Sequence, residues 1–68
     1  MALFGQLIDA LDSREIIKVK KLDVKDPIFI GPVEGLFMDK YDAILTNYKN
    51  TEVYRITVSY GRIMIILD

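Results

Sequence analysis

The chain of 68 residues contains no cysteine and no histidine. Without cysteine it forms no disulfide, and without either residue type it lacks the usual ligands of a structural zinc site. The same absences remove the most common general base and the most reactive nucleophile of enzymes. The sequence also contains no recognisable catalytic or phosphate-binding motif, so it predicts a non-catalytic protein with no cofactor and no metal site.

The chain also lacks an excess of charge of either sign, because nine basic residues nearly balance ten acidic ones. This balance gives no general reason to expect nucleic acid or an anionic membrane as the partner. The longest uninterrupted apolar run, residues 63–67, is far shorter than the roughly 20 residues that cross a bilayer. Residues 2–12 show helical spacing and no basic start, unlike a signal peptide. We therefore expect a cytoplasmic protein that does not bind membranes.

Hydrophobic residues, in contrast, are abundant and make up 51% of the chain. A single domain of this size buries only about 60% of its unfolded surface, and self-association often supplements such a small core. A dense core in a monomer would explain the same composition. We expect one domain over residues 1–68, and we expect it to form a homo-oligomer.

The clearest local pattern is a β-hairpin in residues 52–68, with Tyr60 and Gly61 as its two-residue turn. Alternate residues of a strand share a face, so this turn fixes which side chains lie together. One face then pairs Val58 with Ile63, Ile56 with Ile65 and Tyr54 with Leu67, and the other pairs Thr57 with Met64 and Arg55 with Ile66. A shift by one residue would mix these faces, so we expect this register to hold.

The remaining chain predicts two helices and a second pair of strands. Residues 2–12 carry apolar side chains at helical spacing, residues 15–22 alternate as a strand, and residues 23–27 contain turn-forming Asp and Pro. Residues 28–33 form a strand that should lie at an edge or end at Pro32, because proline donates no hydrogen bond. Residues 36–48 favour a second helix, although residues 43–48 also fit a strand.

These elements predict an α+β domain in the order α-β-β-α-β-β. Two hairpins would form one mainly antiparallel four-stranded sheet, and both helices would cover one of its faces. The predicted core consists of Leu7, Leu11, Ile17, Val19, Ile28, Ile30, Leu36, Ile44, Tyr54, Ile56, Val58, Ile63, Ile65 and Leu67.

The uncovered face of this sheet is the candidate binding surface. It mixes basic side chains with apolar ones, and its predicted members are Ile16, Lys18, Lys20, Phe29, Arg55, Thr57, Arg62, Met64 and Ile66. Protein interfaces are enriched in the same residue types, so we expect self-association and an unidentified protein partner to use this face. Two alternatives remain open: an ordinary solvated face, or a surface on which bases stack and Lys and Arg meet phosphates.

Three segments occur in an order that is known from other proteins: an apolar helix in residues 3–11 with a strand in 15–19, an apolar-Gly-Pro-Val step in residues 29–33, and a hairpin in residues 53–67. In this outline the chain resembles a loose class of small uncharacterised proteins from Gram-positive bacteria and their phages. The class has no established activity. The resemblance implies an accessory protein of a phage or another mobile element.

A second resemblance rests on residues 39–47 and on residues 53–59. These two segments are similar to the conserved segments of Sm-like RNA-binding proteins, which have an N-terminal helix and a small five-stranded barrel. This alternative implies a strand in residues 43–48 and a ring of subunits that binds RNA. It also implies RNA contacts by Tyr41, Asn47 and Arg62.

Overall fold

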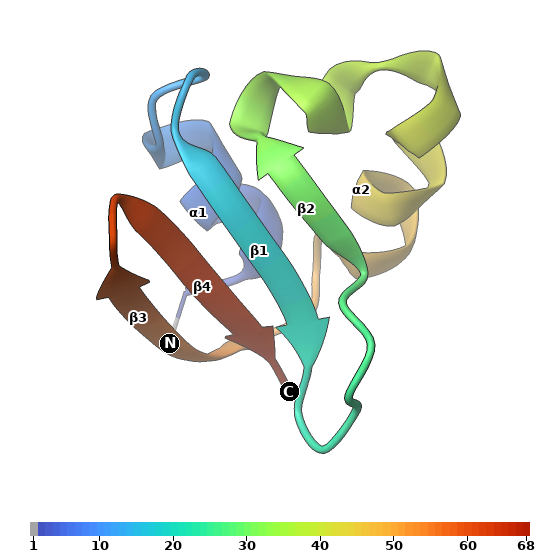
Figure 1. The fold of residues 1–68 in the computed structure, drawn as a ribbon. Helices are drawn as coiled ribbons and strands as arrows, with labels where there is room; N and C mark the ends of the chain where they lie inside the picture. The colour runs from blue at the N-terminus through green and yellow to red at the C-terminus, as the bar shows by residue number, and fades with distance from the viewer. Residues whose placement is uncertain (1) are drawn as a thin grey trace.

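The computed structural model describes residues 2–68 and shows two α-helices and a four-stranded sheet (Figure 1). The helices are α1 (Phe4–Ala10) and α2 (Asp42–Tyr48), and the strands are β1 (Ile16–Lys21), β2 (Phe29–Pro32), β3 (Val53–Ser59) and β4 (Arg62–Leu67). Two short 3-10 helices, η1 (Val33–Phe37) and η2 (Asp39–Tyr41), lie between β2 and α2. The predicted α+β class and the order α-β-β-α-β-β are confirmed.

The strands lie in the order β2-β1-β4-β3, so the two hairpins stand side by side. Each hairpin is antiparallel, while the central strands β1 and β4 are parallel, so the sheet is mixed and not mainly antiparallel as predicted. The chain crosses from β2 at one edge to β3 at the other through η1, η2 and α2, and this long connection is what a parallel pair requires. Residues 43–48 belong to α2, so the described chain does not form the five-stranded barrel of the second resemblance.

Both helices lie behind the sheet in Figure 1, and the face toward the viewer is open. The burial of the central strands alternates accordingly: Ile17, Val19, Ile65 and Leu67 are buried. They pack with residues from α1, β2, η1 and the start of β3, namely Phe4, Ile8, Phe29, Val33, Leu36 and Val53. The predicted core residues Leu7, Leu11, Ile28, Ile44 and Ile63 are partly buried against this cluster.

The C-terminal hairpin has the predicted turn and, over most of its length, the predicted register. Tyr60 and Gly61 have φ values of 52° and 72°, and two positive values identify the type I′ turn that matches the twist of a hairpin. The observed pairs include Val58 with Ile63, Thr57 with Met64, Ile56 with Ile65 and Arg55 with Ile66. The predicted pair of Tyr54 with Leu67 is wrong, because a bulge at Tyr54 places Val53 opposite Leu67.

The outer strand β3 is less buried than the sequence predicts. Tyr54, Ile56 and Val58 have exposed fractions of 45%, 46% and 70%, so their predicted place in the core is wrong. The helix layer covers β1, β4 and β2, but beyond Val53 it leaves β3 uncovered. Apolar side chains therefore remain at the surface along one edge of the sheet.

The alternation of β2 is the reverse of the predicted one. Phe29 is 5% exposed and lies in the core opposite Val19, whereas Ile30 is 53% exposed. The Phe29 ring fits because a Cβ atom on Gly31 or Gly35 would come within 3.3 or 3.1 Å of its Cζ atom. Both the open-face prediction for Phe29 and the core prediction for Ile30 are therefore wrong. The prediction that this strand lies at an edge and ends near Pro32 is confirmed.

The segment before α1 is tied to the segment before and at the start of β3. The Val53 N–H donates to the Ala2 carbonyl at 2.9 Å, and the Phe4 N–H donates to the Thr51 carbonyl at 2.9 Å. Between these two bonds, Leu3 and Glu52 form an isolated antiparallel bridge. Among the described residues, backbone pairing thus covers the outer edge of the β3 region only as far as Val53.

Candidate functional site

The open face of the sheet gathers its residues in three rows that run across the strands. Strand partners share a face, so each row follows directly from the register. The rows are Pro32, Ile16, Arg62 and Ser59; Ile30, Lys18, Met64 and Thr57; and Lys20, Ile66 and Arg55. Eight of the nine residues predicted for this face lie there. Phe29 points to the opposite side of β2, and Ile30 occupies the open face in its place.

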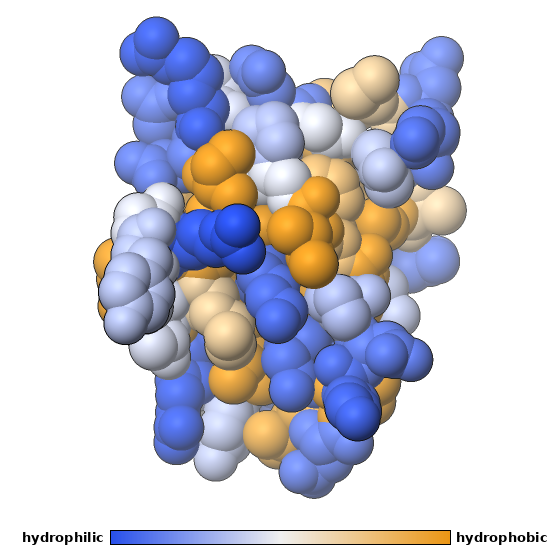
Figure 2. Space-filling view, in the orientation of Figure 1, coloured by the Kyte–Doolittle hydropathy of each residue, from blue (hydrophilic) through white to orange (hydrophobic). Residues whose placement is uncertain are grey.

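Charge on the open face has one sign. Its strand positions carry four cations (Lys18, Lys20, Arg55 and Arg62) and no aspartate or glutamate. Apolar side chains from three strands lie between these cations, and Figure 2 shows them as separate hydrophobic areas divided by hydrophilic ones. Such a surface is complementary to one that combines carboxylates or phosphates with apolar groups.

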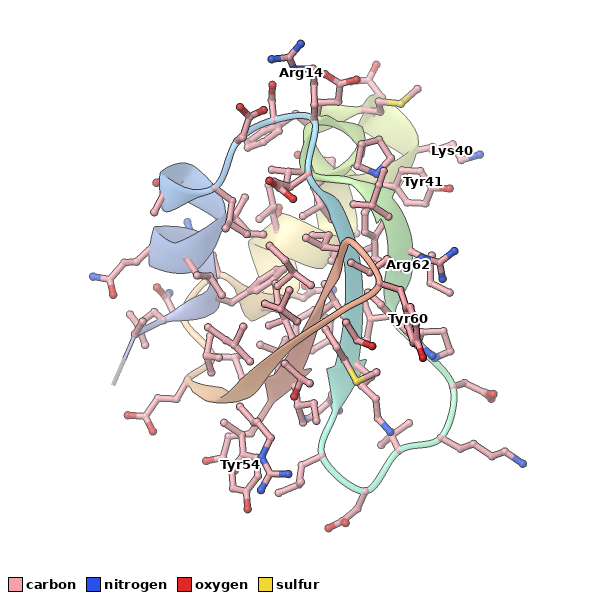
Figure 3. The ribbon with its side chains drawn as sticks, turned by 60° about the vertical axis from the view of Figure 1, so that its left-hand side comes forward. Arg14, Lys40, Tyr41, Tyr54, Tyr60 and Arg62 are labelled. Carbon is pink, nitrogen blue, oxygen red and sulfur yellow. The ribbon has the colours of Figure 1, made fainter. Side chains whose placement is uncertain are left out.

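A hollow of about 350 Å³ lies on this face at the turn end of the C-terminal hairpin. Its lining offers two cations, three hydroxyl groups and a thioether, from Lys18, Arg62, Thr57, Ser59, Tyr60 and Met64. Figure 3 shows Tyr60 and Arg62 projecting from the same side of the hairpin. The hollow can therefore accept an anionic group beside an aromatic ring, with no carboxylate in its lining to repel it.

Tyr60 is the most exposed hydrophobic residue of the described chain, at 102% of its reference area. It also occupies the first central position of a type I′ turn with φ of 52°, where Asn, Asp and Gly are the preferred residues. A tyrosine here sacrifices local stability and gains no burial. Residues in unfavourable backbone conformations cluster at functional sites, so the conformation of Tyr60 supports the hollow as a candidate binding site.

A second apolar surface lies along the outer strand, on the helix side of the sheet. It consists of Ile56 and Val58, with Ile63 of β4 half-buried beside them. A smaller hollow of about 240 Å³ adjoins it and is lined by Ala2, Val53, Tyr54, Arg55 and Ile56. The Arg55 guanidinium lies 5.6 Å from the centre of the Tyr54 ring. We call Ile56 and Val58 the edge pair below.

Features of other kinds of site are few in residues 2–68. This part of the chain has no group of three or more His, Cys, Asp or Glu side chains placed to hold a metal ion. Its one side-chain ion pair, between Arg14 and Asp12 at 3.7 Å, is exposed. None of its helices is long and apolar enough to span a membrane.

The residues implied by the Sm-like resemblance do not meet at one site. Tyr41 lies on η2 and packs edge-on against Phe29, with 5.1 Å between ring centroids, on the helix side of the sheet. Asn47 lies on α2. Arg62, in contrast, lines the hollow on the open face. Of the three, only Arg62 remains a candidate for contact with a ligand on the sheet.

Sequence reasoning missed Ser59, Tyr60 and Ile30 as members of the candidate surface. A signal for Tyr60 was present, because a bulky aromatic residue before Gly61 is unusual in a two-residue turn. Ile30 had no such signal, since its neighbours are also apolar.

No protein-family model, curated protein or solved structure matches this chain.

Proposed function

We propose that this chain is a non-catalytic interaction module that binds a protein partner through its open sheet face and that also self-associates. The observation that carries the proposal is an uncovered face, built from all four strands, that combines four cations with apolar side chains. The first resemblance of the sequence supports a role as an accessory protein of a phage or another mobile element.

The charge of the open face specifies the chemistry of the partner. Its cations have no acidic neighbours among the strand positions, so a complementary partner presents Asp or Glu side chains around apolar ones. Arg and Met are enriched in the centres of protein interfaces, and both occur in this face beside Ile66. Two copies of the face would set cation against cation, so face-to-face self-association is unfavourable.

Lys18 lies at the middle of the open face, between Ile30 and Met64. We expect peptides selected from a random library on the immobilised protein to combine acidic and apolar residues. We expect Lys18→Glu to weaken their binding at least about 10-fold, because like charges then face each other across the contact. Isothermal titration calorimetry with the selected peptides measures this change.

Lys40→Glu is the matched control, because Lys40 lies on η2 in the helix layer with its ammonium 5.0 Å from the Tyr41 ring centre. We expect it to leave the affinity within about twofold, which is less than 0.5 kcal/mol. Selected peptides without acidic residues, or equal losses in the two variants, would contradict binding at the open face. Circular dichroism establishes that both variants keep the fold.

The hollow beside Tyr60 favours a second candidate function, the binding of single-stranded nucleic acid. Such sites combine aromatic rings, on which bases stack, with cations that meet phosphates. Here the ring is Tyr60, and the cations are Lys18 and Arg62. The candidate differs from protein binding in its dependence on salt, because phosphate contacts release counterions.

Tyr60→Asn separates this role from a structural one. Asparagine suits the type I′ turn better, so we expect the free energy of unfolding to rise by about 0.5–1 kcal/mol. Loss of the stacking ring is expected to weaken binding of a uridine decamer between about 5-fold and 100-fold. Chemical denaturation measures the first effect, and fluorescence anisotropy at several salt concentrations measures the second.

Tyr54→Asn is the control for Tyr60→Asn, because Tyr54 is an exposed tyrosine of the same hairpin outside the larger hollow. It should leave decamer binding unchanged. Nucleic acid binding is refuted if the decamer does not bind, if its affinity is independent of salt, or if both tyrosine variants bind equally well.

A further inference from the structure

The outer edge of β3 is open over a short and well-defined window. At one end, the bulge at Tyr54 and the pairing of Val53 with Ala2 interrupt or cover the edge. At the other end, the chain turns away at Tyr60. Between these limits, no strand of the described chain pairs with the outer side of residues 55–59. The window is five residues long, and Thr57 is its centre.

The register of the hairpin determines which backbone groups face outward. A two-residue hairpin closes on a hydrogen-bonded pair, here Ser59 with Arg62, and such pairs then alternate along the strands. Thr57 therefore directs its N–H and C=O groups toward β4. Ile56 and Val58 direct theirs outward, so the edge pair presents two donors and two acceptors along the open window.

We propose that two copies of the chain pair antiparallel along this window, with Thr57 opposite Thr57 of the second copy on a two-fold axis. This register uses all five residues of both windows. It places Ile56 opposite Val58 of the second copy, and Val58 opposite its Ile56. Each opposed pair exchanges two N–H···O=C bonds, so the strands gain four. The two four-stranded sheets become one sheet of eight strands.

Side chains favour the same arrangement. Ile56 and Val58 share the helix side of the sheet and are 46% and 70% exposed, so the two edge pairs form one apolar cluster across the axis. The only charged residue of β3, Arg55, meets Ser59 of the second copy and not its own counterpart. No like charges face each other directly across the contact, which distinguishes this edge from the cationic open face.

The two edges of the sheet differ in their protection. Natural edge strands avoid pairing by being short, by carrying Pro or Lys, or by being covered. β2 has four residues and includes Gly31 and Pro32. β3 has seven residues and contains neither Lys nor Pro. The features that protect β3, the charge of Arg55 and the bulge at Tyr54, lie at one end of its open window. β3 is therefore the less protected edge, it carries the exposed apolar pair, and its window is self-complementary.

This inference rests on the self-association in the proposed function and assigns it to β3. It leaves both open faces free, side by side in one sheet, to receive a partner. Five residues from each copy are fewer than the 20–30 residues per partner of a standard protein interface, so we expect a concentration-dependent dimer with a dissociation constant in the micromolar range.

Because the chain has no cysteine, single substitutions give a clean cross-linking test in the full chain. Thr57→Cys places two thiols on the axis in a non-hydrogen-bonded pair, where Cα atoms lie about 4.5 Å apart and a disulfide fits. We expect it to form a covalent dimer rapidly under mild oxidation. Ser59→Cys is the control, because two Ser59 positions are four residues out of register and roughly 13 Å apart.

Light scattering on the unmodified chain at rising concentration accompanies the cross-linking. A dimer together with selective linkage of Thr57→Cys supports the proposal. Three results would overturn it. The first is equal linkage of Thr57→Cys and Ser59→Cys, and the second is preferential linkage of Ile56→Cys or Val58→Cys. The third is a monomer at several hundred micromolar, roughly 100 times the expected dissociation constant. A monomer that still binds the acidic peptides would overturn self-association, and the β3 dimer with it, but leave binding at the open face intact. A dimer without selective linkage of Thr57→Cys would overturn the β3 dimer alone.

Discussion

Phe29→Ala is expected to lower the free energy of unfolding by about 3–5 kcal/mol, the usual effect of removing a buried phenylalanine. Phe29 is 5% exposed and packs against Val19, Tyr41 and the two glycines beneath its ring. A core of this size rarely supplies more than roughly 3–5 kcal/mol of net stability. The loss is therefore comparable with the whole stability of the domain, and we expect the variant to be largely unfolded at 25 °C.

Ile30→Ala is the matched control, one residue along the same strand and 53% exposed. We expect it to change the free energy of unfolding by no more than about 0.5 kcal/mol. Urea denaturation followed by circular dichroism compares both variants with the original chain. If Ile30→Ala proves the more damaging substitution, then β2 presents the opposite face to the core.

The contrast between these neighbours shows why sequence alone did not place them. Residues 28–30 are all apolar, so the sequence pattern does not show which of them face the core and which face the open side. Phe29 faces the core because Gly31 and Gly35 leave space for its aromatic ring. Gly35 belongs to η1, beyond the end of β2, and its approach to Phe29 depends on how the chain folds back.

The hairpin of β3 and β4 could be predicted because its information is local. A two-residue turn and the alternation on either side fix the register of most of its pairs. The parallel contact between β1 and β4 joins segments about 45 residues apart, and no local pattern reports it. The sequence accordingly predicts the order of the elements correctly but does not predict the mixed sheet.

The candidate site was predictable where a strand had a clear polar and apolar alternation. Lys18 and Lys20 alternate with Ile17 and Val19, so β1 could be oriented, and the hairpin register oriented β4. The coverage of a face was not predictable. Alternation identifies the side of β3 that carries Ile56, but only the extent of the helix layer determines whether that side is buried.

Ile56 and Ile65 lie opposite each other on the same face, yet we expect their replacement by alanine to differ in effect. Ile65 is fully buried in a central strand, so Ile65→Ala should lower the free energy of unfolding by about 2–5 kcal/mol. Ile56 is 46% exposed, so in dilute solution Ile56→Ala should cost less than about 1 kcal/mol. Urea denaturation at low micromolar concentration measures both changes.

The same pair of variants distinguishes a solvated edge from a paired one. Association stabilises the folded state by mass action, so a dimer through β3 raises the melting temperature of the original chain as its concentration increases. Ile56→Ala removes part of the apolar cluster at the axis and should weaken this dependence, whereas Ile65→Ala should lower the melting temperature at every concentration. Equal costs for the two variants in dilute solution would mean that β3 is covered there, contrary to the described structure. A melting temperature independent of concentration in the original chain would mean that the edge stays unpaired.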